Sequence, residues 1–157
     1  MRRVDTVIAL TLLLGGCVRA SSPEPPPSRP HAVLFDIGTN EPVQLDVRVA
    51  DTTETRRRGL MGVMELGDME GMAFVFDGPT TTSFWMKDTP IPLSIAFVDG
   101  VDRIVAIRDM TPCASDPCPT YGAGEPFVLA VEANLGFFRR FHVRVGDTAR
   151  LVETGYA

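Results

Sequence analysis

Short apolar segments separated by turn residues dominate the chain after residue 42. Val43 to Val49 alternates apolar and polar residues, which is typical of a half-buried strand. Further strands are predicted at 72–76, 83–86, 93–98, 104–108, 127–131 and 148–152, with turns at Asp77-Gly78-Pro79 and Asp99-Gly100 between them. Many short strands with frequent turns predict a mainly β fold, a compact antiparallel sandwich or barrel-like domain.

One or two short helices are expected to cover an open end of this domain. Asp51 stands three residues before Glu54, which is the spacing of a capping box and predicts a short helix through Arg58. Gly59 can end that helix in a left-handed turn. Asn134 is expected to cap a second, short helical turn.

The N-terminus has the pattern of an export signal. Arg2 and Arg3 precede an apolar segment from Val7 to Leu14, which is too short to span a bilayer of about 30 Å. Small residues then lead to Cys17. Residues 1–16 resemble a bacterial lipoprotein signal with lipidation at Cys17, and the alternative is an ordinary secretion signal that is cut elsewhere.

A tether and a single domain are expected after this signal. Residues 17–31 are rich in proline, which favours an extended spacer, and 32–157 are expected to form the domain. Two acyl chains hold a protein stably at a membrane. Val18 stands where inner-membrane lipoproteins usually carry aspartate, so the expected location is the periplasmic face of the outer membrane, with the membrane bound through the N-terminal lipid.

Charge and cysteine content narrow the classes of partner and cofactor. The formal net charge of −5 opposes nucleic-acid binding, which depends on cationic contacts to phosphate. Cys113 and Cys118 are expected to form a disulfide in an oxidising compartment. A redox pair usually has the tighter C-x-x-C spacing, and no histidine lies nearby to complete a zinc site. We therefore expect no metal at the two cysteines and no cofactor.

Five motifs together resemble those of the domain-of-unknown-function family 192, DUF192. They are Arg58-Gly59-Leu60-Met61-Gly62, Gly71-Met72-Ala73-Phe74-Val75-Phe76, Phe84-Trp85-Met86-Lys87, Ile91-Pro92-Leu93 and Val131-Glu132-Ala133-Asn134. The similarity covers about 43–152, nearly the whole expected domain. The resemblance implies a compact β domain and carries no assigned activity.

Lys87 and Trp85 are the most distinctive polar and aromatic residues of these motifs. Lys87 is the only lysine, against fourteen arginines, and Trp85 is the only tryptophan. In a strand the two side chains would share a face. An indole beside an amine suits a sugar or another polar ligand with an apolar face. The alternative is an ordinary surface pair in which the lysine packs over the ring.

Glu132 and the methionines extend the candidate site. Glu132 would end a strand, where its carboxylate could form a structural ion pair with Lys87 or an arginine, or act as an acid–base group. Sequence patterns of serine hydrolases, phosphate-binding loops and zinc proteases are absent, so catalytic residues stay unassigned. The predicted ligand-binding residues are Arg58, Met61, Met72, Trp85, Lys87 and Glu132.

Three functions remain open from the sequence. The first is a lipoprotein that binds a small molecule or a cell-envelope component. The second is a Cu(I)-binding protein, because thioethers suit Cu(I), although methionine also fills cores and lines apolar grooves. The third is a hydrolase that uses Lys87 and Glu132 as an acid–base pair. The methionines of the second hypothesis fall within 26 residues, at 61, 64, 69, 72 and 86.

Overall fold

The computed structural model describes residues 30–155. Within this range the chain forms nine strands and two short helices: β1 (His31–Asp36), β2 (Val43–Ala50), α1 (Thr53–Arg58), β3 (Glu70–Thr80), β4 (Phe84–Trp85), β5 (Leu93–Val98), β6 (Ile104–Met110), β7 (Thr120–Tyr121), β8 (Phe127–Asn134), α2 (Phe137–Arg140) and β9 (Thr148–Glu153). The predicted signal, the lipidation site Cys17 and the tether up to residue 29 lie outside the described residues.

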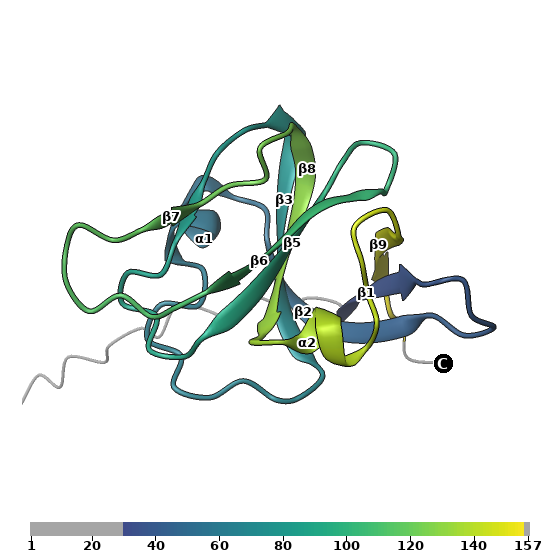
Figure 1. Cartoon of the computed structure of the whole chain (residues 1–157), viewed down its shortest axis with the longest axis horizontal. Helices are drawn as coiled ribbons and strands as arrows, with labels where there is room; N and C mark the ends of the chain where they lie inside the picture. The colour runs from purple at the N-terminus through teal and green to yellow at the C-terminus, as the bar shows by residue number, and fades with distance from the viewer. Residues whose placement is uncertain (1–29, 156–157) are drawn as a thin grey trace, which may run out of the picture.

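Seven strands form one curled sheet in the order β6-β5-β8-β3-β2-β1-β9, and β4 pairs with β7 separately (Figure 1). Neighbouring strands of the large sheet are antiparallel except β2 and β3, which run parallel. A parallel pair needs a crossover connection, and the segment containing α1 supplies it. The prediction of a mainly β, barrel-like fold with short helices is confirmed.

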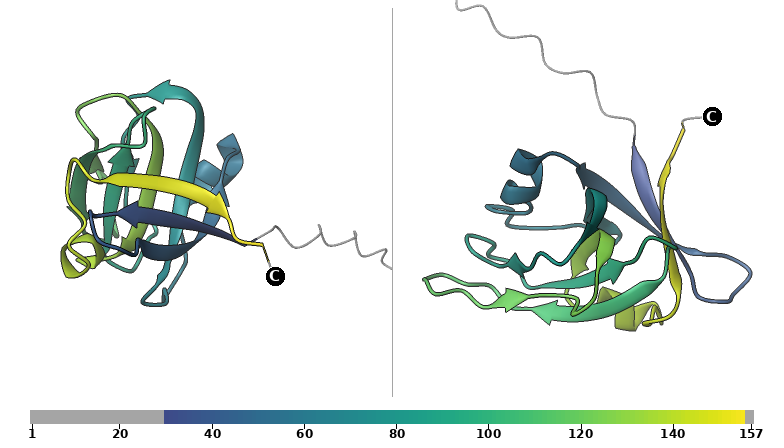
Figure 2. Two further views of the ribbon diagram at one scale, coloured as in Figure 1. Left: turned by 90° about the vertical axis from the view of Figure 1, so that its right-hand side faces the viewer. Right: turned by 90° about the horizontal axis from the view of Figure 1, so that it is seen from above.

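The two edges of the large sheet meet at one end. The amide of Ala149 donates to the carbonyl of Asp102 at 2.9 Å, and the amide of Ile104 donates to the carbonyl of Asp147 at 2.9 Å. These bonds join the starts of β6 and β9, so the sheet is closed there and open elsewhere. The structure places α1 and β7 at one end of the molecule and β1 and β9 at the other (Figures 1 and 2).

Both faces of the central strands are buried. All six residues of β5 are buried, and alternate side chains enter different cores. Ile95 and Phe97 belong to the core beneath α1, whereas Ala96 and Val98 belong to the core beneath α2. The continuous apolar sequence of β5 therefore reflects burial on two sides. Within residues 30–155 no helix is long and apolar enough to span a membrane.

Three local predictions were wrong in their details. Asp77-Gly78-Pro79 was expected to form a turn, but β3 continues to Thr80. The pairing of β3 with β8 is irregular between Val75 and Thr80, and this irregularity accommodates a proline that cannot donate to the ladder. Asn134 was expected to cap a helix, but it ends β8, and α2 follows Gly136.

The third error concerns the start of α1. The capping box uses Thr52 and Thr55 rather than Asp51 and Glu54. The Thr52 hydroxyl accepts from the Thr55 amide at 3.1 Å, and the Thr55 hydroxyl accepts from the Thr52 amide at 3.0 Å. The short hydroxyl side chains satisfy both amides in this reciprocal way. The helix still ends at Arg58, as predicted, and Gly59 follows it with a φ of 48°.

Candidate functional site

Glu132 is a buried acidic residue in the middle of the large sheet. Its relative exposure is 4 %. It lies opposite Met72 of β3 and Ile95 of β5, and both neighbours belong to the apolar core beneath α1. Directly opposed residues of neighbouring antiparallel strands have adjacent side chains on the same face. The carboxyl group is therefore placed among apolar side chains.

The Glu132 carboxyl has no protein partner within residues 30–155. It forms no hydrogen bond and no ion pair there, and instead it faces a small cavity. Removal from water disfavours the charged form, and this desolvation raises the pKa of Glu132 from 4.5 to about 8. At neutral pH the side chain is consequently a carboxylic acid that can both donate and accept a hydrogen bond.

The cavity has a volume of about 40 Å³ and adjoins a wider groove of about 420 Å³, with which it shares lining residues. We call the first the Glu132 cavity and the second the Trp85 cleft. The cavity is large enough for one small polar group. Thr89 and Gly59 also line it. Residues that line both the cavity and the cleft are Arg56, Arg57, Phe74, Phe84 and Trp85.

The last turn of α1 supplies three consecutive arginines to this site. Arg56 is fixed, because its guanidinium donates to the carbonyls of Asp51 at 2.6 Å and Val75 at 2.7 Å. Arg57 and Arg58 are exposed, and within the described part of the chain neither forms an ion pair. Their guanidinium groups are therefore available to an anion at the mouth of the cavity.

Gly59 keeps α1 close to the sheet. A Cβ atom there would lie 3.3 Å from the ring of Phe74, and the φ of 48° is one that side-chain-bearing residues rarely adopt. A glycine at this position thus lets the arginines lie directly beside the cavity.

Trp85 lines both the cavity and the cleft, and Lys87, which lines neither, lies beside Trp85. Trp85 is 46 % exposed, and the Lys87 ammonium lies 5.7 Å from the centre of its ring. Lys87 also donates to the Asp116 carboxylate at 2.6 Å. The hydrogen bond and the negative charge of Asp116 raise the pKa of Lys87. The predicted proximity of ring and amine is present, although β4 ends at Trp85 and does not include Lys87.

A disulfide holds the loop that carries Asp116. Cys113 and Cys118 are bonded, with 5.7 Å between their Cα atoms. The backbone of Cys113 forms a bridge with Lys87, and its amide donates to the carbonyl of Met86 at 3.2 Å. The disulfide loop is therefore attached directly to the segment that presents Trp85.

The six predicted ligand-binding residues do not all meet at one place. Arg58, Met61, Trp85 and Glu132 line the Glu132 cavity. Met72 is buried in the core beside Glu132 and does not line the cavity. Lys87 lines neither the cavity nor the cleft and is paired with Asp116, and within residues 30–155 it forms no ion pair with Glu132.

The five methionines occupy different environments. Met72 and Met86 are buried in the core, whereas Met64 and Met69 are 76 % and 38 % exposed. Met61 lines the cavity. This arrangement does not support the Cu(I) hypothesis, and the separation of Lys87 from Glu132 does not support the acid–base pair.

Sequence reasoning missed Arg56, Arg57, Phe84, Thr89 and Asp116. The consecutive arginines at 56–58 were a usable signal, because three cations at the end of a short helix are unusual in an acidic chain. Asp116 could not have been found in this way, since it contacts Lys87 from 29 residues away.

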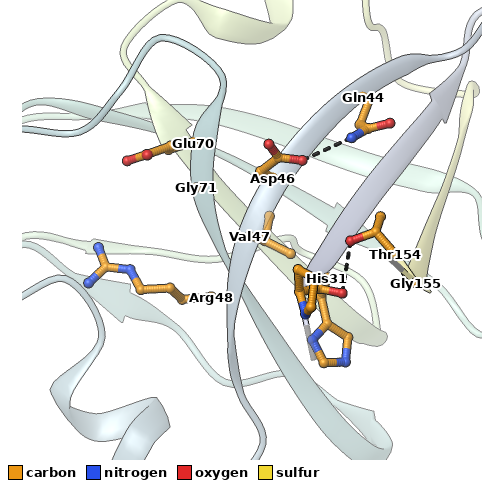
Figure 3. Close-up of a pocket in the computed structure, with 10 residues that line it drawn as sticks. His31, Gln44, Asp46, Val47, Arg48, Glu70, Gly71, Thr154 and Gly155 are labelled. Carbon is orange, nitrogen blue, oxygen red and sulfur yellow. Dashed lines mark hydrogen bonds between the residues drawn. The ribbon is translucent and has the colours of Figure 1, made fainter. Parts of the chain in front are cut away.

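Three other concavities within residues 30–155 contain none of the predicted site residues. The one in Figure 3 has a volume of about 510 Å³ and lies beside His31, Asp46 and Glu70. It is open, and the Gln44 amide donates to the Asp46 carboxylate at 2.9 Å within it. The second, of about 560 Å³, adjoins α2 and includes Ser94.

Ser94 is occupied by structural hydrogen bonds. Its hydroxyl donates to the Asp109 carboxylate at 2.5 Å and accepts from the Gly136 amide at 2.8 Å. Only Glu132 combines deep burial, a missing partner and an adjoining cavity among the described residues.

The fold and this site define a small, mainly β domain with a buried acid beneath an aromatic and basic cleft. The sequence pattern of DUF192, described as "Uncharacterized ACR", matches residues 35–151, and the chain belongs to this family.

Two solved structures are similar along most of their length. A protein of unknown function from Novosphingobium aromaticivorans is 30 % identical, with a TM-score of 0.69, and the match covers 85 % of this chain and 94 % of that one. A protein from Sinorhizobium meliloti, described as a candidate transcription regulator, is 25 % identical, with a TM-score of 0.72, covering 80 % and 95 %. The comparison with curated proteins gave no match.

Proposed function

We propose that this protein is a lipid-anchored, periplasm-facing binding protein that holds a small molecule or a cell-envelope component in the Trp85 cleft. The observation that carries the proposal is the unpartnered Glu132 carboxyl, which faces the small cavity that adjoins this cleft.

Burying a carboxyl group without a partner destabilises the fold. Buried polar side chains are nearly always hydrogen-bonded, whereas Glu132 is 4 % exposed and keeps only a small part of its hydration without gaining a protein hydrogen bond among the described residues. An apolar residue at position 132 would fit the surrounding core of Met72 and Ile95 better. A ligand that hydrogen-bonds Glu132 would supply the missing partner and explain why an acid stands there.

The walls of the cleft suit a ligand that is polar on one side and apolar on the other. Trp85, Phe74 and Phe84 offer aromatic surface, while Arg57 offers hydrogen-bond donors. Aromatic walls with a few convergent polar groups are the usual lining of small-molecule sites. The cleft therefore has the chemistry of a binding site.

The lipid anchor is proposed from the N-terminal pattern alone. A Cys17→Ser variant should appear in the soluble periplasmic fraction, whereas the parent protein should stay with the membranes. Equal membrane association of the two would exclude anchoring through Cys17.

Ligand binding is tested by native mass spectrometry of the full lipidated chain, extracted from membranes in detergent. We expect a retained small-molecule mass that is lost in Trp85→Ala and Glu132→Leu. Lys87→Arg should weaken retention, because a planar guanidinium cannot reproduce the compact contact with Asp116 beside the indole. Glu125→Gln, an exposed control, should retain the mass. A bare protein, or retention by all variants, would refute binding at this cleft.

A further inference from the structure

We propose that the ligand of the Trp85 cleft is an acidic sugar, with its anionic group on Arg57 and Arg58, its ring on Trp85 and one hydroxyl in the Glu132 cavity. This inference rests on the proposed binding function and names the substrate class of the same site.

The charge of the cleft favours an anion. The chain has a formal net charge of −5, yet three consecutive cations stand at the end of α1. Lys87 is neutralised by Asp116 at 2.6 Å, but no described carboxylate pairs with Arg57 or Arg58. Guanidinium groups bind carboxylate and phosphate through two parallel hydrogen bonds. The unpaired positive charge therefore lies where a carboxylate or phosphate of the ligand would rest.

The size of the Glu132 cavity limits the group that reaches the acid. About 40 Å³ admits one small polar group and excludes a ring. An ammonium would be repelled there, because Arg56, Arg57 and Arg58 line the same cavity. A hydroxyl is neutral, and it can exchange both hydrogen bonds with a protonated carboxyl.

Trp85 supplies the surface that a sugar ring needs. Its indole is 46 % exposed and lines both the cavity and the cleft. The C–H groups on one face of a pyranose carry partial positive charge, and they pack on the negative face of an aromatic ring. A molecule that joins such a ring face to an anion and a free hydroxyl is a uronic acid or a sugar phosphate.

The test uses four probes on the full lipidated chain in detergent: D-glucuronate, D-glucose 6-phosphate, neutral D-glucose, and benzoate as an anion without hydroxyls. Trp85 is the only tryptophan, so its fluorescence reports binding directly. We expect at least one acidic sugar to bind at least tenfold more tightly than glucose and benzoate. The preferred acid then distinguishes a carboxylate ligand from a phosphate ligand.

Variants locate the two ends of the ligand. The double change Arg57→Gln with Arg58→Gln should remove the tenfold preference for the acidic sugar over glucose. Glu132→Leu should weaken both sugars, while leaving benzoate unaffected. Arg150→Gln, an exposed arginine on β9, is the matched control and should change nothing.

Each other outcome overturns the inference. If glucose binds as tightly as both glucuronate and glucose 6-phosphate, the ligand needs no anionic group and the inference is wrong. If benzoate binds as tightly as the preferred acidic sugar, the ligand needs no sugar ring and the inference is also wrong. If no probe binds while native mass spectrometry still shows a retained ligand, the substrate class is wrong and the binding function stands. If neither experiment detects a ligand, both proposals fail.

Discussion

Replacing Glu132 by glutamine should change how the stability of the protein depends on pH. Glutamine has nearly the same shape and keeps a donor and an acceptor, but it does not titrate. Burial among Met72 and Ile95 raises the pKa of Glu132 from 4.5 to about 8 in the folded protein. The unfolded chain regains the ordinary value. The two states therefore bind different numbers of protons between about pH 4.5 and pH 8.

The sign follows from which state holds the proton. Within this window the folded protein keeps the Glu132 proton, while the unfolded chain has lost it. Because the unfolded state binds fewer protons, the free energy of unfolding falls as pH rises. The loss of unfolding free energy caused by Glu132 is small at pH 5 and reaches about 5 kcal/mol above pH 8, since each pKa unit corresponds to about 1.4 kcal/mol.

The assay is urea denaturation of the parent protein and of Glu132→Gln at pH 5, 6, 7 and 8. We expect the difference in unfolding free energy to grow by about 3 to 4 kcal/mol from pH 5 to pH 8, in favour of the variant. His31 and His142 are present in both proteins, so they cancel in the difference. Glu125→Gln should follow the parent at every pH. A constant difference for Glu132→Gln would refute the buried, neutral acid.

Two further predictions concern the disulfide and the core. Changing Cys113 and Cys118 together to serine opens a ring with a sequence separation of 5. The chain-entropy model predicts that this change lowers the free energy of unfolding by about 2 kcal/mol. Urea denaturation measures the loss, and an unchanged midpoint would contradict the prediction. Phe97→Ala should lower the free energy of unfolding by about 3 to 5 kcal/mol, because Phe97 is fully buried and the centre of its ring lies 4.9 Å from that of Phe127. Val101→Ala, at a 77 % exposed site, should stay within about 0.5 kcal/mol in the same assay.

Strands could be predicted where their own residue pattern specified both the strand and its ends. Leu93–Val98 was predicted with its observed bounds, because an apolar segment followed by Asp99-Gly100 specifies both the strand and its turn. The two-residue strand β7 was missed, since its pairing depends on β4 rather than on its own sequence. The bulged end of β3 was predicted to be a turn, because Gly78 and Pro79 are common in turns as well as in strand irregularities.

The site was harder to predict than the fold, because its members come from distant segments. Trp85 and Glu132 stood out by residue type, but their relation to α1 depends on the crossover between β2 and β3. The partner of Lys87 was the main error of pairing. Sequence reasoning suggested Glu132 as a partner, whereas the structure gives Asp116 from the disulfide loop. Neither spacing nor periodicity carries that information.

Glu132 and Trp85 are held in place by different parts of the fold, and this affects the cellular compartment in which the site keeps its shape. The sheet fixes Glu132, whereas Trp85 depends on Lys87, Asp116 and the disulfide loop behind them. Reduction of the disulfide would loosen Asp116, and with it the Lys87 contact beside Trp85. The buried Glu132 would stay in place. Such bonds persist in oxidising compartments and are rare in the cytosol. The proposed periplasmic location is therefore the setting in which the cleft would keep its shape.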